Sequence, residues 1–283
     1  MQEVPDQVMQ HFQYVGPLPP LLSETSGLAI WDSTLWTHND SGDGPFLYQV
    51  ELGGKKLLRQ ISIRGAGAID WEDMTQDEKY FYMGDFGNNN GNRKDLCIYE
   101  VPLDSIRANT VKKVTNARKI PFTYEDQSRF NYAPYQHNFD CEAMIAIGDS
   151  LYLFSKNHEN DSCRFYALAK QNEVPAIAQL RGGFDTKGTI TGGAYLDRPG
   201  GPVLVLLGYN YKSSNTFYPF LWLFTDFTGT HFFSGKHQRI NLPPIVQMEG
   251  IAFLNDHEVL ISSEAENLAF AKLYRFDLTS WLE

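Results

Sequence analysis

Five polar residues occupy the same place in five successive segments of similar sequence. They are Ser26, Glu72, Glu142, Thr191 and Glu249. Each stands at the start of a short apolar stretch typical of a β-strand, and each is followed by further strands. Carboxylates and hydroxyls are oxygen donors that bind hard cations, and Ca²⁺ accepts about six to eight of them in irregular geometry. If the segments surround one axis, these residues predict a calcium site.

Three carboxylates that converge on one narrow site would repel one another. Two unit charges about 4 Å apart, at an effective dielectric constant of about 20, interact with about 4 kcal/mol. Either the carboxyl pKa values rise, or a cation lies among the acids. Asp70 and Asp140 each stand two residues before one of the glutamates and so share its face of the strand. The alternative is that each glutamate caps the backbone of the next segment or binds water.

A second set of polar residues stands at the ends of the second strands. First and second strands run antiparallel, so this set should lie on the same face as the first. The candidate catalytic residues are Asp40, Asp85, Glu264 and His38. The candidate ligand-binding residues are Asn39, Asn88, Arg93, Lys156 and Tyr209. An acid here would act as a base and a cation would hold a phosphate or carboxylate.

Each member of the second set also has a purely structural interpretation. Asn, Asp, Ser and Gly are common turn formers, which would explain residues 38–42 and 85–89. Arg93 and Lys156 would then simply pair with a neighbouring acid. Residues 130–137 and 210–219 interrupt the repeat, and they either wall a cleft on this face or pack over a sheet.

The elements that must position these residues are short strands. Most apolar residues fall in runs rich in Val, Ile, Tyr, Phe and Trp, separated by Gly, Asn, Asp and Pro. Fourth strands are expected at residues 57–63, 113–122, 176–180 and 238–242. The last copy has none, and residues 12–15 would supply it and close the ring. The pattern predicts one all-β domain over residues 1–283, a five-bladed β-propeller with four-stranded blades. A β-sandwich is the alternative.

The order Ser, Glu, Glu, Thr, Glu resembles the calcium-binding ring of the calcium-activated nucleotidases, or soluble apyrases, which has Ser, Glu, Glu, Ser, Glu. Thr191 departs from that pattern but keeps a hydroxyl group. The resemblance implies a five-bladed propeller whose ring, here Ser26, Glu72, Glu142, Thr191 and Glu249, holds Ca²⁺. It extends to the blade framework, and no counterpart of the nucleotidase phosphate-binding loops is found.

The chain also resembles, over its whole length, a group of bacterial propeller proteins common among Bacteroidetes. The shared motifs are Ser-Glu-Thr-Ser-Gly-Leu, Trp-Thr-His-Asn-Asp-Ser-Gly, Asp-Trp-Glu-Asp-Met and Gly-Asp-Phe-Gly-Asn-Asn. They lie here at residues 23–28, 36–42, 70–74 and 84–89. This resemblance implies the propeller fold and no particular reaction.

Composition excludes several classes of function. The formal net charge of −10 argues against nucleic acid or an anionic membrane surface as a partner. No apolar run approaches the roughly 18 residues that span a bilayer, so no membrane insertion is expected. Serine-nucleophile, phosphate-loop, zinc-protease and dinucleotide motifs are missing from the sequence.

Cysteine usage and the N-terminal residues bear on the compartment. The three cysteines, Cys97, Cys141 and Cys163, show no CxxC spacing, which indicates neither a disulfide framework nor a zinc site and leaves one disulfide open. The first residues lack the basic and apolar regions of a signal peptide. The protein is therefore either cytoplasmic, or periplasmic or secreted with a leader that this chain lacks.

These observations predict a calcium-binding propeller with a polar site at one mouth of its channel. The first hypothesis is a metal-dependent hydrolase of a phosphoester or a related small anionic substrate. The alternative is a non-catalytic propeller that binds a ligand or protein, with a purely structural metal, because propellers host both kinds of activity.

Overall fold

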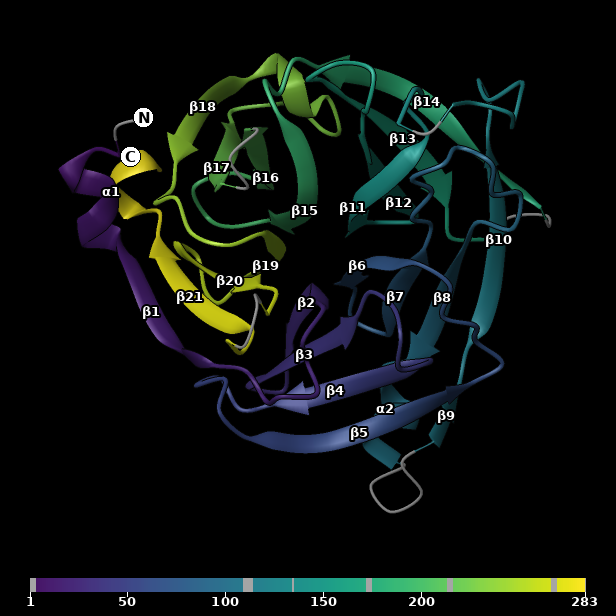
Figure 1. The fold of residues 1–283 in the computed structure, drawn as a ribbon, viewed down its shortest axis with the longest axis horizontal. Coiled ribbons are helices and arrows are strands. Elements are labelled where there is room, and N and C mark those ends of the chain that lie inside the picture. Colours follow the sequence, from purple (N-terminus) through teal and green to yellow (C-terminus); the bar gives the residue numbers. More distant parts are fainter. Residues whose placement is uncertain are drawn as a thin grey trace.

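The innermost strands of the molecule surround a central axis (Figure 1). The computed structural model describes residues 4–108, 114–133, 135–171, 175–212, 216–265 and 269–282. The inner strands are β2 (Thr25–Trp31), β6 (Trp71–Gln76), β11 (Asp140–Ile147), β15 (Thr189–Leu196) and β19 (Met248–Phe253). Each contacts the next, and β19 contacts β2, so they form a closed ring. A two-layer β-sandwich, the alternative considered above, does not have this arrangement.

Each inner strand begins an antiparallel sheet that extends outward. Two sheets have four strands each, in the orders β15-β16-β17-β18 and β1-β21-β20-β19. The first contains β16 (Val203–Lys212), β17 (Thr216–Thr225) and β18 (Lys236–Asn241). The second contains β20 (Glu258–Ser263), β21 (Lys272–Asp277) and β1 (Phe12–Pro17). A five-stranded sheet holds β2, β3 (Thr34–Asn39), β4 (Phe46–Val50), β5 (Leu57–Arg64) and β9 (Val114–Asn116).

The fourth sheet has eight strands and joins two antiparallel sets at their outer edges. One set contains β6, β7 (Tyr80–Asp85), β8 (Cys97–Pro102) and β10 (Arg118–Tyr124). The other contains β11, β12 (Ser150–Lys156), β13 (Cys163–Ala169) and β14 (Ala176–Phe184). The join is a parallel pairing in which Phe122, Thr123 and Tyr124 lie opposite Ala176, Ile177 and Ala178. Hydrogen bonding therefore gives four sheets, where the sequence predicts five separate ones.

The N-terminal strand closes the ring, as expected. Strand β1 pairs antiparallel with β21, with Phe12 opposite Phe276 and Tyr14 opposite Tyr274. The first and last strands of the chain therefore lie side by side (Figure 1). This pairing covers the edge that β21 would otherwise expose.

One of the predicted fourth strands differs from the structure. The fourth strand predicted over residues 113–122 is two strands, and residue 113 lies outside the described residues. Strand β9 pairs in parallel with β5 of the preceding sheet, while β10 pairs with β8. The remaining elements of the described residues are the short α-helices α1 (Asp6–His11) and α2 (Leu103–Ala108) and the 3₁₀ turns η1 (Phe232–Ser234) and η2 (Thr279–Trp281).

Apolar side chains of neighbouring sheets pack together between them. Trp36 of β3 lies 5.4 Å from Phe81 of β7, measured between ring centroids, and both side chains are fully buried. Trp71 of β6 belongs to the same cluster. Burying one large apolar side chain stabilises a fold by roughly 1.5–3 kcal/mol, so such layers hold the sheets in fixed positions around the axis. The inner strand ends are thereby held in fixed positions as well.

Candidate metal centre and adjoining cavity

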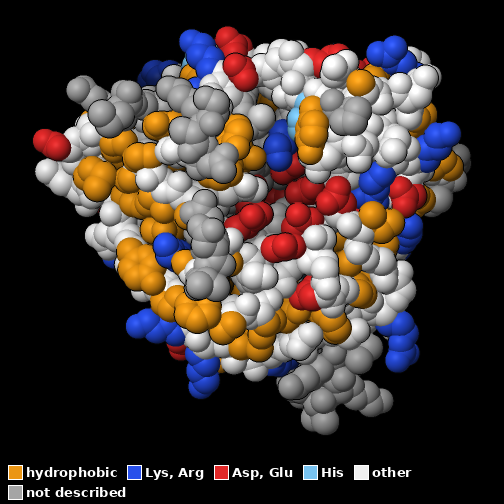
Figure 2. Space-filling view, in the orientation of Figure 1, with side chains coloured by type: hydrophobic (Ala, Val, Ile, Leu, Met, Phe, Trp, Pro, Cys, Tyr) orange, Lys and Arg blue, Asp and Glu red, His pale blue; other side chains and the backbone are white. Residues whose placement is uncertain are grey.

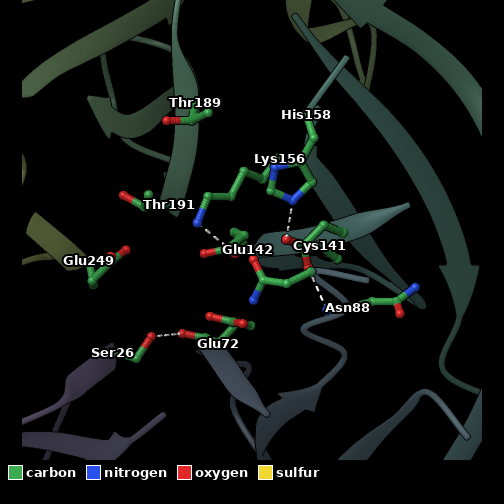
Figure 3. A network of polar contacts seen from close by, with 12 residues as sticks. Ser26, Glu72, Asn88, Cys141, Glu142, Lys156, His158, Thr189, Thr191 and Glu249 are labelled. Atoms are coloured by element: carbon green, nitrogen blue, oxygen red, sulfur yellow. Dashed lines mark hydrogen bonds and ion pairs between the residues drawn. The ribbon is translucent and has the colours of Figure 1, made fainter. Parts of the chain in front are cut away.

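Every predicted ring residue lies in a β-bulge of its inner strand. The register of each inner strand against its neighbour shifts between Thr25 and Leu28, Trp71 and Met74, Cys141 and Ala143, Ile190 and Gly192, and Met248 and Ile251. A bulge adds an unpaired residue and re-aims its side chain. All five ring residues are buried and surround one central space (Figure 3). The repeat therefore identifies positions that are structurally equivalent.

Neighbouring inner strands approach closely beside these bulges. A Cβ atom at Gly250 would overlap the Ser26 carbonyl oxygen, and one at Gly192 would overlap the Glu249 carbonyl oxygen. Only glycine fits where two backbones come this near. At the equivalent position of β6, the Asp73 carboxyl group accepts hydrogen bonds from the Met74 and Met144 amides, each at 2.8 Å. Asp73 therefore ties β6 to β11 beneath the ring.

The two hydroxyl groups of the ring bind backbone. Ser26 Oγ donates to the Glu72 carbonyl oxygen, and Thr191 Oγ1 donates to the Met248 carbonyl oxygen at 2.8 Å. Each hydroxyl group thus caps the backbone of the next inner strand. This is the structural alternative that the sequence analysis considered for the glutamates, but the carboxylates instead lie close to one another.

The carboxylates gather in two overlapping groups at the mouth of the axis. One contains Asp40, Asp70 and Glu72, and the other Glu72, Asp140 and Glu142. Within each group, one oxygen of every carboxylate lies within 4.8 Å of the others. Figure 2 shows acidic side chains in a hollow at the centre of this face. The expectation that Asp70 and Asp140 share a face with the ring glutamates is therefore confirmed, and Glu72 lies at the centre of the acidic cluster.

Glu249 lies across the ring from this cluster. Gln247 Nε2 donates to Glu249 Oε1, and a longer contact of 3.4 Å leads from the same nitrogen to Glu264 Oε1. Glu249 Oε2 is buried and has no hydrogen-bond partner in the described part of the chain. Figure 3 shows the side chain directed at the central space. Burying a carboxylate oxygen without a hydrogen-bond partner costs free energy, so we expect a cation or a water molecule to contact this atom.

Two nitrogen donors cover the acids of β11. Lys156 Nζ lies 2.9 Å from Glu142 Oε1, and His158 Nε2 lies 2.7 Å from Asp140 Oδ2 (Figure 3). Both donors come from the end of β12 and the segment after it. Lys156 Nζ also lies 5.9 Å from the centre of the Tyr209 ring. Lys156 therefore stands between the acids and the aromatic side chain of β16.

Several carboxyl groups at the mouth have pKa values above their usual range. Burial, followed by the charge of Asp70, raises the pKa of Asp40 to about 8, and burial followed by the charge of Glu249 raises the pKa of Glu264 to about 8. Burial and the neighbouring Glu142 likewise raise the pKa of Glu72 well above its usual range. This is the outcome expected when carboxylates converge without a cation.

A cavity of about 770 Å³ opens beside Lys156. Its lining includes Lys156, His158 and the aromatic side chains of Tyr135, Tyr209, Tyr211 and Phe217. Tyr135 belongs to the first of the two predicted insertions and Phe217 to the second. The structure therefore favours the interpretation in which these insertions wall a cleft.

Comparison with known proteins supports the fold. No family model matches the chain, and no curated protein matches its sequence. Among solved structures, it is similar to a glucose dehydrogenase (TM-score 0.53, 9% identity, covering 94% of this chain and 98% of that one). It is also similar to the PQQ-bound aldose sugar dehydrogenase of Streptomyces coelicolor (TM-score 0.50, 10% identity, 94% and 97%). A third similar structure is the GH43_1 enzyme of Xanthomonas citri complexed with xylotriose (TM-score 0.53, 12% identity, 96% and 92%).

The chain has a fold of the β-propeller type. At 9–12% identity these similarities establish the fold alone. The propeller places the starts of the inner strands around one mouth of the axis, which is where the acidic cluster and the cavity lie.

Several residues of the second set have structural partners. Arg93 Nη2 lies 2.8 Å from Asp85 Oδ1, and Arg93 Nη1 donates to the Gly87 carbonyl oxygen at 2.8 Å. Asn88 donates through Nδ2 to the Phe139 carbonyl oxygen at 3.0 Å. Arg93 thus pairs with a loop acid, the alternative stated for it above, and its guanidinium is directed at Asp85.

His38 and Asn39 support the first sheet. His38 is fully buried, packs edge-on against Trp71 at 5.3 Å, and has a pKa lowered by burial to about 4. It is a neutral core histidine. Asn39 Nδ2 donates to the Leu21 carbonyl oxygen and to Asp43 Oδ2, both at 2.8 Å. Of the four predicted catalytic residues, Asp40 and Glu264 lie at the acidic mouth.

Sequence reasoning missed His158, Gln247 and Asp73. His158 stands two residues after Lys156, the last residue of β12, and its closeness to that strand end was the available signal. Gln247 and Asp73 each adjoin a ring position or stand two residues from one. The roles of Gln247 and Asp73 depend on their hydrogen bonds, which residue type alone does not reveal.

The cysteines and membrane prediction can also be compared with the structure. Cys97, Cys141 and Cys163 are buried, free thiols, so the disulfide left open by the sequence is not formed. In the described ranges, no helix is long and apolar enough to cross a membrane.

Proposed function

We propose that this chain is a single five-bladed β-propeller domain that binds Ca²⁺ at the acidic mouth of its axis. The closed ring of five inner strands supports the blade count, because each inner strand leads into its own antiparallel set of four. On this interpretation the eight-stranded sheet is two blades whose outer strands, β10 and β14, pair across the rim.

The observation that carries the metal proposal is the position of Glu72. Its carboxylate belongs to both close groups of acids, with Asp40 and Asp70 on one side and Asp140 and Glu142 on the other. Lys156 supplies one positive charge at this point, through Glu142. Burial, followed by mutual repulsion, raises the pKa of Glu72, and a divalent cation beside it would offset that repulsion.

The donor set fits calcium better than other common ions. The close groups consist of carboxylate oxygens, and the buried Glu249 Oε2 offers one more across the ring. Zinc and copper prefer nitrogen and sulfur, and magnesium demands near-octahedral geometry. The His158 side chain binds Asp140 from outside and would orient that carboxylate, as hydrogen-bond partners of metal ligands commonly do.

We further propose a metal-dependent hydrolase that acts on a small phosphoester or a related anionic molecule. A bound cation would supply charge stabilisation for the reacting oxygens. Lys156 stands between the acids and the cavity and would attract the anionic group of the substrate. Glu264, whose carboxylate lies 3.4 Å from Gln247 Nε2 at the same mouth, would act as the general base, the role predicted for it from the sequence.

Titration with Ca²⁺, monitored by calorimetry, tests the metal site. We expect the native protein to bind Ca²⁺ and to melt at a higher temperature with it than with EDTA. Glu72→Gln should weaken Ca²⁺ binding by at least about tenfold, because it removes a charge shared by both groups of acids. Glu125→Gln, at an exposed position on the outer part of the molecule, is the matched control and should bind Ca²⁺ normally. Unchanged Ca²⁺ affinity in Glu72→Gln would contradict the site.

A substrate panel with and without Ca²⁺ tests the reaction. It should contain nucleotides, simple phosphoesters and lactones. Glycosides belong in it too, because a structurally similar protein is complexed with xylotriose. We expect turnover of a phosphoester that stops when Ca²⁺ is removed. If Ca²⁺ binds and stabilises the fold but no compound is turned over, the hydrolase is wrong and the protein is a binding propeller with a structural metal.

A further inference from the structure

An extended hairpin beside the acidic mouth carries aromatic side chains into the cavity. Strands β16 and β17 have ten residues each, and their pairing continues past the mouth through Tyr211 opposite Phe217 to Lys212 opposite Thr216. The second strands β3, β7 and β20 have six residues each and end near the mouth. The additional residues of β16 and β17 do not help to close the ring, which β1 and β21 close. The part of the hairpin beyond the mouth therefore needs another explanation.

The aromatic rings of this hairpin form a continuous wall. Tyr209 meets Phe217 edge to face at 4.9 Å, and Tyr211 lies 5.4 Å from Phe217, measured between ring centroids. All three line the cavity, and the Tyr211 side chain is 58% exposed. An aromatic wall that solvent can reach is a typical platform for stacking a flat or puckered ring.

The same cavity is also lined by nitrogen donors. Lys156 and His158 line it, and each is hydrogen-bonded to one acid of the proposed metal site, Glu142 and Asp140 respectively. The cavity therefore combines aromatic stacking surfaces with positive or hydrogen-bonding groups that lie next to the acids. A ligand that uses both kinds of group must combine a ring with a group that carries negative oxygens.

We propose that this cavity binds a ring compound bearing one oxyanion group, with the ring against Tyr211 and Phe217 and the oxyanion at Lys156. The proposal rests on the metal site proposed above. Without a cation, the carboxylates beside Lys156 repel an anion. Ligand binding therefore depends on Ca²⁺, and Tyr211 and Phe217 determine specificity for the ring.

Calorimetry with matched probes tests this site. Phenyl phosphate and glucose 6-phosphate supply an aromatic and a sugar ring, methyl phosphate supplies the oxyanion alone, and phenol supplies a ring alone. At saturating Ca²⁺ we expect the two ring phosphates to bind at least about fivefold more tightly than methyl phosphate, and phenol to bind much more weakly. Whichever ring phosphate binds more tightly tells whether the wall selects an aromatic or a sugar ring. In EDTA the ring phosphates should lose at least about tenfold in affinity.

Substitution of the wall provides the second arm. Tyr211→Ala should weaken the preferred ring phosphate by about three- to tenfold while leaving methyl phosphate and Ca²⁺ binding unchanged. Tyr14→Ala is the matched control, since Tyr14 is also 58% exposed and lies on β1, away from the cavity. Ring phosphates that bind no better than methyl phosphate, or bind equally to Tyr211→Ala, would overturn the proposal. Failure of the native protein to bind Ca²⁺ would instead contradict the metal site, so the two failures are distinguishable.

Discussion

Lys156 Nζ bonds Glu142 Oε1 at 2.9 Å and also lies 5.9 Å from the centre of the Tyr209 ring. The side chain is only 13% exposed, and burial of the pair removes most of its hydration. One cation thus connects a cluster of acids with an aromatic-lined cavity. It offsets part of the negative charge there, and the remaining charge is what a divalent cation would neutralise.

Replacing Lys156 with methionine keeps the apolar stem and removes the charge. Breaking a buried ion pair by removing one partner costs about 3–5 kcal/mol, so Lys156→Met should lower the free energy of unfolding in EDTA by about that amount. Because Glu142 then lacks the positive charge of Lys156, Ca²⁺ should bind more tightly and restore much of the stability. Urea unfolding with and without Ca²⁺ measures both effects.

Lys236→Met is the control for that experiment. The Lys236–Asp226 pair has a similar length of 2.8 Å but both side chains are largely exposed. Water screens an exposed ion pair, so little change in the free energy of unfolding is expected. A Ca²⁺-induced stabilisation of Lys156→Met equal to that of the native protein would mean that the cation binds away from Glu142.

The pH dependence of stability should be inverted from that of most proteins when metal is absent. Burial raises the pKa values of Asp40 and Glu264 to about 8, whereas unfolded carboxyl groups have pKa values of about 4. Between those values the folded state holds protons that the unfolded state has released. The free energy of unfolding therefore falls as pH rises from about 4 to about 8, by about 1 kcal/mol per pH unit for each such group.

Urea unfolding in EDTA at pH 5.5, 7 and 8.5 measures this slope. Added Ca²⁺ favours the deprotonated acids and should flatten or reverse it. A metal-free protein that became more stable between pH 5.5 and 8.5 would show that the acids at the mouth are ionised and compensated in some other way.

Much of this site could be predicted because the fold repeats. Equivalent positions in five similar segments must meet at the axis, which placed Glu72, Glu142 and Glu249 together. The prediction that Asp70 and Asp140 lie beside the ring glutamates was also confirmed, although Asp70 precedes β6 and is not part of the strand. What a repeat cannot show is the direction of each side chain after a bulge, since the bulge breaks the alternation on which such predictions depend.

The roles of the loop residues could not be predicted for a related reason. Arg93 lies in the loop between β7 and β8 and pairs with Asp85, while Lys156 is the last residue of β12 and pairs with the ring acid Glu142. Both are cations expected near this face, and residue type alone does not show which acid each one contacts. The pairing of β10 with β14 was also hidden, because it depends on how the outer edges of two sheets meet in space.

Gly87 provides a test of the acidic cluster that changes no charge. A Cβ atom there would overlap Glu72 Oε1 and lie 2.5 Å from Asp70 Oδ2. Gly87→Ala should push both carboxylates aside and weaken Ca²⁺ binding on the order of tenfold, with only a modest loss of stability, because carboxylate ends can shift. In Gly53→Ala, the control, the new atom would be 3.9 Å from its nearest neighbour, and Ca²⁺ binding should be unchanged. Equal Ca²⁺ affinity in both variants, measured by calorimetry, would place the cation elsewhere.

Substitution of Arg93 tests whether its guanidinium group stabilises the fold or binds the ligand. Its pair with Asp85 is buried, with side chains 12% and 2% exposed, so Arg93→Gln leaves an uncompensated acid and should destabilise the fold by about 3 kcal/mol. Adding Asp85→Asn should recover part of that loss, because the double variant removes both charges. In the folded Ca²⁺-loaded protein, the affinity for phenyl phosphate should stay within about twofold of the native value, since the guanidinium is held by Asp85 and the Gly87 carbonyl oxygen. A large loss of phosphate affinity without a loss of stability would instead assign Arg93 to the ligand site, as the sequence alone suggests.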